Sequence, residues 1–158
     1  MILEHKIAVV TGAGQGIGQG IALKLAEKGA HVVVSDVREQ TAIDTAAQIE
    51  TMGRRALGLK ADVANRGEIL KMVETTIAEF GRIDILVNNA GTNPYAGPLL
   101  KAEEWAWDAT MNVNLKGPFL LSQLVARIMK EQGGGTIINT SSVGGLKATE
   151  LHIYSITK

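Results

Sequence analysis

The sequence predicts an α/β fold in which helices cover both faces of a parallel β-sheet. Short apolar runs alternate along the chain with longer segments that have helical periodicity. These runs are continuously apolar, which is typical of strands buried on both faces of a parallel sheet. Glycines follow most of the helical segments, at positions where glycine readily ends a helix.

The expected elements follow one another as strand and helix. Strands are expected at residues 7–10, 31–35, 56–61, 83–87 and 136–139. Helices are expected at residues 17–28, 39–52 and 65–80, with Asn65 as an N-cap and with Gly29, Gly53 and Gly81 ending them. Residues 101–129 are expected to be helical with a bend at Gly117-Pro118, because proline lacks the N–H that a helix needs. We expect a single domain over residues 1–158, since no repeat or linker divides the chain.

The composition is that of a folded protein without a nucleic-acid or membrane partner. Hydrophobic residues make up 46% of the chain and charged residues 20%, a balance typical of globular domains. Sixteen Lys and Arg offset 16 Asp and Glu, so the net charge is zero and gives no indication of a nucleic-acid or membrane-surface partner. Cysteine is absent and the three histidines lie far apart, so neither a disulfide nor a metal site is expected. No apolar run reaches the roughly 18 residues of a membrane span, and the polar start does not resemble a signal peptide, so we expect a cytoplasmic protein.

A glycine-rich turn lies between the first expected strand and the first expected helix. A dinucleotide pyrophosphate needs bare backbone N–H groups and a helix N-terminus, which side chains at such a turn would block. Glycine turns also occur as plain tight turns, but the strand before, the helix after and an acidic residue downstream favour dinucleotide binding. The spacing is Thr-Gly-x-x-x-Gly-x-Gly, formed by Thr11, Gly12, Gly16 and Gly18.

This spacing resembles the glycine motif of the short-chain dehydrogenase/reductase family. The resemblance implies a Rossmann-type doubly wound sheet and a nicotinamide dinucleotide cofactor. The related sugar-nucleotide epimerases would need Gly-x-x-Gly-x-x-Gly, and Gln15 breaks that pattern. The cofactor contacts implied at this turn are Gly12, Gly14, Gln15, Gly16, Ile17 and Gly18.

The end of the second strand indicates which dinucleotide is bound. A carboxylate at Asp36 can accept hydrogen bonds from the adenosine ribose hydroxyls and would repel a 2′-phosphate. An Asp at this place could also serve only to form a turn, and the nearby Arg38 could soften the choice. Neither Gln15 nor Val37 is basic, so we expect NAD(H) in preference to NADP(H).

Two further segments resemble the family's cofactor contacts. The pair Asp62-Val63 follows the third strand, where the family contacts the adenine ring. The tetrad Asn88-Asn89-Ala90-Gly91 follows the fourth strand and matches a specific family motif, with Asn89, Ala90 and Gly91 implied at the cofactor.

The catalytic constellation is expected near the end of the chain. Tyr154 and Lys158 match the family's Tyr-x-x-x-Lys, and residues four apart share one face of a helix. A phenol titrates near pH ~10, and a nearby ammonium favours its ionised form. The resemblance therefore implies that Tyr154 exchanges a proton with the substrate oxygen, while Lys158 tunes it and holds the nicotinamide ribose.

Two more catalytic residues are implied by the resemblance. Ser142 matches the serine that polarises the substrate carbonyl, although the family's usual spacing to the tyrosine fits Ser141, which stays the alternative. Asn114, in an Asn-Leu-x-Gly context, matches the asparagine that holds a water for proton relay. Asparagine is a poor residue for a helix interior, which agrees with a specific role.

These residues predict an oxidoreductase that moves hydride between a secondary alcohol or ketone and nicotinamide. The alternative is a catalytically inactive dinucleotide-binding fragment. Members of the family are longer than this chain, so we expect the last strands and the substrate loop to be missing, and 158 residues alone to be inactive or poorly soluble. The resemblance also implies a homotetramer or homodimer in the full-length form, with a small alcohol or ketone as substrate.

Overall fold

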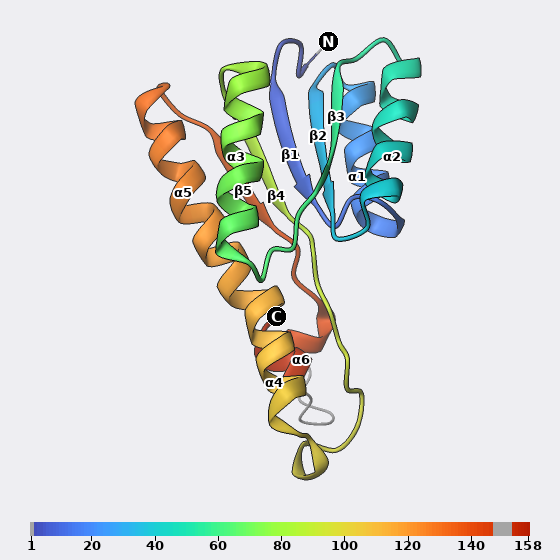
Figure 1. Cartoon of the computed structure of the whole chain (residues 1–158), viewed down its shortest axis with the longest axis vertical. Coiled ribbons are helices and arrows are strands. Elements are labelled where there is room, and N and C mark those ends of the chain that lie inside the picture. The colour runs from blue at the N-terminus through green and yellow to red at the C-terminus, as the bar shows by residue number, and fades with distance from the viewer. Residues whose placement is uncertain (1, 147–152) are drawn as a thin grey trace.

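A five-stranded parallel sheet forms the centre of the molecule. The structure is a computed structural model that describes residues 2–146 and 153–158 (Figure 1). The strands are β1 (Ile7–Thr11), β2 (His31–Asp36), β3 (Ala56–Lys60), β4 (Ile85–Asn88) and β5 (Thr136–Asn139). Their order is β3-β2-β1-β4-β5, and every pair of neighbours is parallel. This order reverses direction at β1, as in a doubly wound Rossmann-type sheet, and it confirms the expected fold class.

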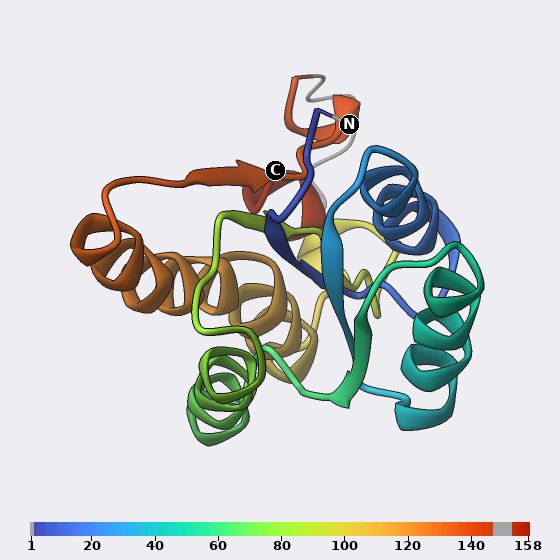
Figure 2. The ribbon, with the colours of Figure 1, turned by 90° about the horizontal axis from the view of Figure 1, so that it is seen from above.

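Helices cover both faces of the sheet, as Figure 2 shows from above. The helices are α1 (Gly16–Glu27), α2 (Glu39–Thr51), α3 (Arg66–Phe80), α4 (Glu104–Met111), α5 (Gly117–Glu131) and α6 (Ile153–Ile156). Helices α1 and α2 pack on one face, around Val32 and Val34, and α3 and α5 on the other, around Val9 and Val33. Successive residues of β2 therefore serve opposite cores, which explains why its sequence is continuously apolar.

The expected helix ends are confirmed with their physical causes. The side chain of Asn65 accepts hydrogen bonds from the backbone N–H groups of Gly67 at 2.9 Å and Glu68 at 3.3 Å, which caps α3. Gly81 ends the same helix in the left-handed conformation, with φ at 77°. Gly29 and Gly53 also have positive φ just beyond α1 and α2.

The fourth strand is shorter than the sequence predicts, since it begins at Ile85 and not at residue 83. The backbone of Ile83 bonds to the carboxamide of Gln132, which accepts its N–H and donates to its carbonyl. Asp84 turns its carboxylate onto the N–H of Ile7 at 2.9 Å. Side chains thus occupy backbone groups that a longer ladder would use.

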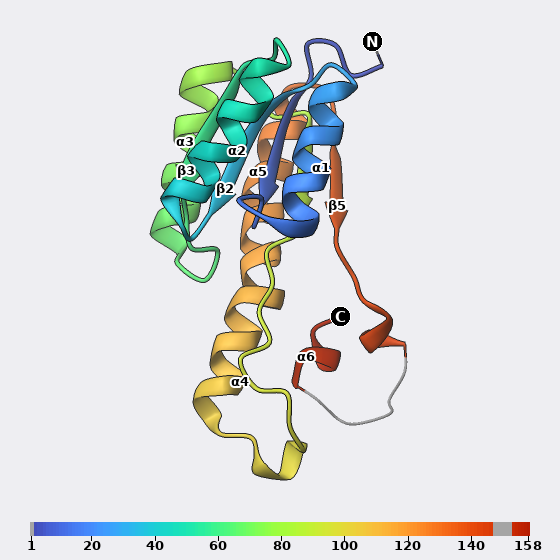
Figure 3. The ribbon, with the colours of Figure 1, turned by 90° about the vertical axis from the view of Figure 1, so that its right-hand side faces the viewer.

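Residues 101–129 do not form one bent helix. The segment consists of a 3-10 turn (Leu99–Lys101), α4, a π-helical turn (Asn112–Lys116) and α5. The N–H of Gly117 bonds to the carbonyl of Asn112, five residues back, and Pro118 has no N–H to offer Asn114. The irregularity therefore precedes the expected bend and covers Asn114. Figures 1 and 3 show α4 extending below the sheet, with α6 nearby.

Within the described residues, no helix is long and apolar enough to cross a membrane.

Candidate active site

Two adjoining hollows open at the carboxyl ends of the strands, where doubly wound sheets place their ligands. One has a volume of about 260 Å³ and lies beside the ends of β2 and β3. The other, about 560 Å³, lies between the glycine turn, the end of β4 and α6. Both are lined by Gly12, Gln15, Ala90 and Gly91, so they form one cleft.

The smaller hollow brings together the residues expected at the adenosine end. Asp36, Asp62 and Val63 line it, together with Arg38. Asp36 is 6% exposed, and its carboxylate accepts the backbone N–H groups of Gly14 at 3.0 Å and Arg38 at 3.1 Å. A carboxylate has about four acceptor positions, so Asp36 keeps capacity for ribose hydroxyls. The Nε of Arg38 lies 3.6 Å from its Oδ1.

The glycine turn has the shape that a pyrophosphate needs. Gly12 and Gly16 both have φ at +60°. A Cβ on Gly12 would lie 2.8 Å from the Cα of Ala90, whereas the Cβ position of Gly16 has nothing within 4 Å among the described residues. The first turn of α1 carries no acidic side chain, and Gln15 does not cap it within the described chain. The turn therefore offers backbone N–H groups to an anion over Gly16.

The Asn-Asn-Ala-Gly segment is tied to the glycine turn. The Oγ1 of Thr11 accepts the N–H groups of Asn89 and Ala90, both at 3.1 Å. The Nδ2 of Asn89 donates to the carbonyls of Thr11 at 3.1 Å and Gly12 at 3.2 Å. The Asn88 carboxamide bonds to Asn139 on β5 at 2.8 Å. These bonds hold the end of β4 and the residues after it against the glycine turn and β5.

Tyr154, Lys158 and Ser142 line the larger hollow. The ammonium of Lys158 lies 5.6 Å from the centre of the Tyr154 ring and donates to the carbonyl of Thr140 at 3.0 Å. Gly144 separates the serine from the tyrosine, since a Cβ there would lie 3.5 Å from the Oγ of Ser142 and 3.6 Å from the Cε1 of Tyr154. The three residues thus face the same space, although Ser142 comes from the β5–α6 connection, Tyr154 from α6 and Lys158 from just beyond α6.

The two candidate serines make different hydrogen bonds. The Oγ of Ser142 accepts the N–H of Gly144 at 3.1 Å, so its proton stays available to a ligand. The Oγ of Ser141 donates to the carbonyl of Lys158 at 3.0 Å, which uses its proton. If Ser142 has the catalytic role, the connection from this serine to Tyr154 is one residue shorter than the usual spacing in the family. Residues 147–152 of that connection lie outside the described residues.

Asn114 lies in the π-helical turn and is 5% exposed. Its Oδ1 accepts the N–H of Thr92 at 2.8 Å, and its Nδ2 donates to the carbonyl of Thr92 at 2.9 Å and to the Oγ1 of Thr157 at 3.1 Å. The carboxamide therefore holds protein groups, and both of its N–H donors are engaged.

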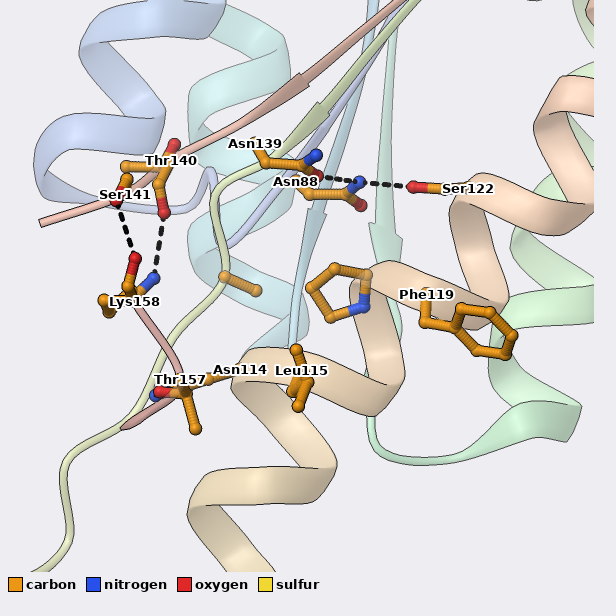
Figure 4. Close-up of a pocket in the computed structure, with 12 residues that line it drawn as sticks. Asn88, Asn114, Leu115, Phe119, Ser122, Asn139, Thr140, Ser141, Thr157 and Lys158 are labelled. Atoms are coloured by element: carbon orange, nitrogen blue, oxygen red, sulfur yellow. Dashed lines mark hydrogen bonds between the residues drawn. The ribbon is translucent and has the colours of Figure 1, made fainter. Parts of the chain in front are cut away.

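A second cavity, of about 300 Å³, lies on another side of Lys158 (Figure 4). Asn114, Thr157 and Lys158 line one side of it, and Asn88 lines another. It borders the same lysine as the larger hollow, so Lys158 lies between the two.

Several residues of this site had no distinctive signal in the sequence. Thr92, Thr140 and Thr157 act through a backbone group or a buried hydroxyl, and Gly144 through its lack of a side chain. Thr157 could have been noticed only because it directly precedes Lys158. Thr92 and Asn93, which follow the Asn-Asn-Ala-Gly segment, also line the larger hollow.

In the part of the chain that the structure describes, no group of three or more His, Cys, Asp or Glu could hold a metal ion. His152, one of the three histidines, lies outside that part.

Comparison with known proteins agrees with the geometry of this cleft. Residues 6–158 match the family model described as short chain dehydrogenase. The chain is 44% identical to an uncharacterized oxidoreductase of Thermotoga maritima, covering all of this chain and 62% of that relative. It is 42% identical to the (2S)-[(R)-hydroxy(phenyl)methyl]succinyl-CoA dehydrogenase subunit BbsD of Thauera aromatica, covering 63% of it. The chain thus spans less than two thirds of the length of these relatives.

Solved structures show the same architecture. A putative short-chain alcohol dehydrogenase from Sinorhizobium meliloti matches with a TM-score of 0.94 and 38% identity, over 99% of this chain and 62% of that one. An NAD⁺-bound xylitol dehydrogenase matches with a TM-score of 0.95 and 30% identity, over 100% of this chain and 61% of that one. The chain belongs to the short-chain dehydrogenase family.

Proposed function

We propose that the protein is an NAD(H)-dependent oxidoreductase that interconverts a secondary alcohol and a ketone. The observation that carries this proposal is the continuity of the cleft. It leads from Asp36 past Gly12 and Gly16 to Tyr154 and Lys158, so one extended dinucleotide could contact residues at both ends. The alcohol and ketone chemistry also agrees with the dehydrogenase and reductase names of the relatives.

Each residue of the cleft has a role in this proposal. A bound nicotinamide would supply or accept the hydride. The residues proposed to hold the cofactor are Gly12, Gly14, Gln15, Gly16, Ile17, Gly18, Asp36, Asp62, Val63, Asn89, Ala90, Gly91, Tyr154 and Lys158. Tyr154 would give a proton to the ketone oxygen in reduction and remove one from the alcohol in oxidation. Ser142 would donate a hydrogen bond to that oxygen, and Asn114 would support the proton path behind Lys158.

The preference for NAD(H) rests on Asp36. Its buried carboxylate can accept two ribose hydroxyls but would lie against the extra phosphate of NADP(H). Arg38 opposes this preference, because its guanidinium is close enough to offset part of that charge. The xylitol dehydrogenase that shares this fold holds NAD⁺, which supports the same cofactor here.

Cofactor titration and turnover test the proposal in two steps. NADH should quench or shift the protein fluorescence on binding, with an affinity at least about ten-fold above that of NADPH, which corresponds to about 1.4 kcal/mol. A panel of ketones and polyols should then include at least one substrate. Equal affinity for both cofactors would refute the NAD(H) preference. Binding without turnover of any of them would favour the inactive dinucleotide-binding alternative.

Tyr154→Phe isolates the acid–base step. This variant should lose turnover by at least about a thousand-fold, since it removes the group that general acid–base catalysis requires. It should bind NADH nearly as well as the parent, because it removes one hydroxyl and leaves the aromatic ring and the other proposed cofactor contacts in place. Tyr95→Phe is the matched control, because it removes the chain's other phenol, which bonds to the carbonyl of Pro98 outside the cleft. Comparable losses in both variants would contradict the role of Tyr154.

The assembly, the location and the extent of the domain stay predictions. The family resemblance implies a homodimer or homotetramer, the composition a cytoplasmic protein, and the absence of linkers a single domain over residues 1–158.

A further inference from the structure

Thr157 lies between the two residues of the catalytic motif and is 9% exposed. Its Oγ1 donates to the carbonyl of Tyr154 at 2.7 Å, and its N–H bonds to the same carbonyl at 3.0 Å. The side chain therefore closes the turn that places Lys158 relative to Tyr154.

The same hydroxyl accepts a hydrogen bond from Asn114, 43 residues earlier in the chain. Figure 4 shows the two side chains next to one another below the cavity. Asn114 in turn holds both backbone groups of Thr92, which follows the Asn-Asn-Ala-Gly segment. One chain of hydrogen bonds therefore runs from the end of β4 through the π-helical turn to the tyrosine.

The π-helical turn gives this chain of bonds its geometry. The turn buries Asn114 and places its carboxamide between Thr92 and Thr157. Both N–H groups of that carboxamide are engaged, so it is locked in one orientation. Removal of the Thr157 hydroxyl would leave one buried donor of Asn114 without its partner, and buried donors of this kind are costly to leave unpaired.

We infer that Thr157 is a positioning residue, which holds the Tyr154–Lys158 turn onto Asn114 and so aligns the tyrosine with the substrate oxygen. This inference rests on the proposed function for its catalytic consequence, but the hydrogen-bonded bridge itself is independent of it. Thr157 touches neither cofactor nor substrate in this role. It acts through the carbonyl of Tyr154 and the carboxamide of Asn114.

Two substitutions separate the hydroxyl from the shape of the side chain. Thr157→Val keeps the volume and removes both hydrogen bonds, whereas Thr157→Ser keeps the hydroxyl. Thr76→Val is the matched control, because Thr76 is also buried and its hydroxyl also bonds to a carbonyl of its own helix, Met72 at 2.8 Å. Thr76 lies on α3, away from the cleft residues.

Hydrogen exchange tests the bridge without any substrate. In Thr157→Val, the amide of Thr92 should exchange roughly five-fold faster, which is the size of one net hydrogen bond, although Thr92 does not bond to Thr157. Thr157→Ser and Thr76→Val should leave this exchange rate within about two-fold. Unchanged exchange at Thr92 in Thr157→Val would overturn the inference.

The catalytic consequence is tested by steady-state kinetics with NADH and a ketone from the substrate panel that the parent protein reduces. Thr157→Val should lower kcat by about ten- to a hundred-fold, as small misplacements of reacting groups do, while KM and the NADH affinity stay within about three-fold. Thr157→Ser should restore most of kcat. Faster exchange with an unchanged kcat would refute the positioning role, as would a serine variant as slow as the valine variant. If the parent turns over no alcohol or ketone, the proposed function fails, and the exchange of Thr92 still decides whether the bridge exists.

Discussion

Three glycine substitutions distinguish backbone strain, steric clash and cofactor contact in the glycine turn. Gly12, Gly16 and Gly53 all have positive φ, at 60°, 60° and 75°. Alanine in this left-handed region costs about 1–2 kcal/mol at each position. The positions differ in what the new methyl group would meet, so the differences between the variants isolate the other effects.

The clash is expected only at Gly12. A Cβ there would lie 2.8 Å from the Cα of Ala90 and 3.2 Å from its N, so the backbone of the Asn-Asn-Ala-Gly segment or of the glycine turn would have to move. Overpacking of this kind adds about 1–3 kcal/mol, which gives Gly12→Ala a total cost of about 2–5 kcal/mol. Gly16→Ala and Gly53→Ala should cost only the strain, since the space around both Cβ positions is open among the described residues.

The affinity for NADH distinguishes Gly16→Ala from Gly53→Ala. Gly16 lies in the cleft at the start of α1, whereas Gly53 follows α2 away from it. Gly16→Ala should therefore weaken NADH binding at least about ten-fold, or about 1.4 kcal/mol, and Gly53→Ala should leave it unchanged.

Urea denaturation and NADH titration of the three variants provide the measurements. Equal losses of unfolding free energy in Gly12→Ala and Gly16→Ala would refute the clash at Ala90. Unchanged NADH affinity in Gly16→Ala would show that the open space over this glycine is not where the pyrophosphate lies.

Three further predictions concern charged and titrating groups. Asp36→Ala should weaken NADH binding at least about ten-fold and reduce the preference for NADH over NADPH, because it removes the proposed ribose acceptor and the acceptor of the Gly14 N–H. Titration of both cofactors measures these effects, and an unchanged preference would contradict the role of Asp36. Asp84→Ala should lower the free energy of unfolding in urea by about 2 kcal/mol, since this buried carboxylate bonds to Arg82 and to the N–H of Ile7; a loss below about 0.5 kcal/mol would count against that role. Burial and the charge of Arg55 lower the pKa of His31 below its ordinary 6.5. The contribution of His31 to stability is therefore present above pH 6.5 and is lost as the pH falls through the pKa of the folded state. In thermal melts from pH 7.5 downward, His31→Asn should lose less stability than the parent, and parallel curves would contradict this.

Asp84 makes a second acid-sensitive contribution to stability at the same end of the sheet as His31, because its carboxylate bonds to Ile7, the residue of β1 that pairs with His31. Burial raises the pKa of Asp84, but the hydrogen bonds from Arg82 and from the N–H of Ile7, with the charges of Arg82 and Lys6, outweigh burial. The resulting pKa lies below the ordinary 3.8. A lowered carboxylate pKa stabilises the fold above the unfolded value and loses that stability as the pH falls through the folded value. The contribution of Asp84 should therefore disappear only below about pH 3.8, well after that of His31.

Local sequence signals were sufficient for the sheet and most helices. Continuous apolar runs place β1 and β2 because both faces of these strands are buried, and Asn65 and Gly81 bound α3 because capping depends on single residues. The start of β4 was wrong by two residues, since the Gln132 carboxamide that occupies the backbone of Ile83 comes from 49 residues away. No local pattern predicts such a bond.

The prediction of one bent helix over residues 101–129 was wrong for a related reason, and the affected residues lie at the candidate site. Periodicity predicts helix but cannot distinguish a π-helical turn from an α-helical one, because both leave the same residue types on the buried side. Pro118 indicates an irregularity in the helix but not its position, which also depends on packing. Gly117 lies so close to the segment between β3 and α3 that a Cβ there would be 2.6 Å from the carbonyl of Val63. The π-helical turn lies directly before Gly117, and within it the carboxamide of Asn114 bonds to Thr92 and Thr157. The sequence motif identifies Asn114 as a candidate site residue. Its hydrogen-bond partners, Thr92 and Thr157, depend on the packing of three segments that are distant in the sequence.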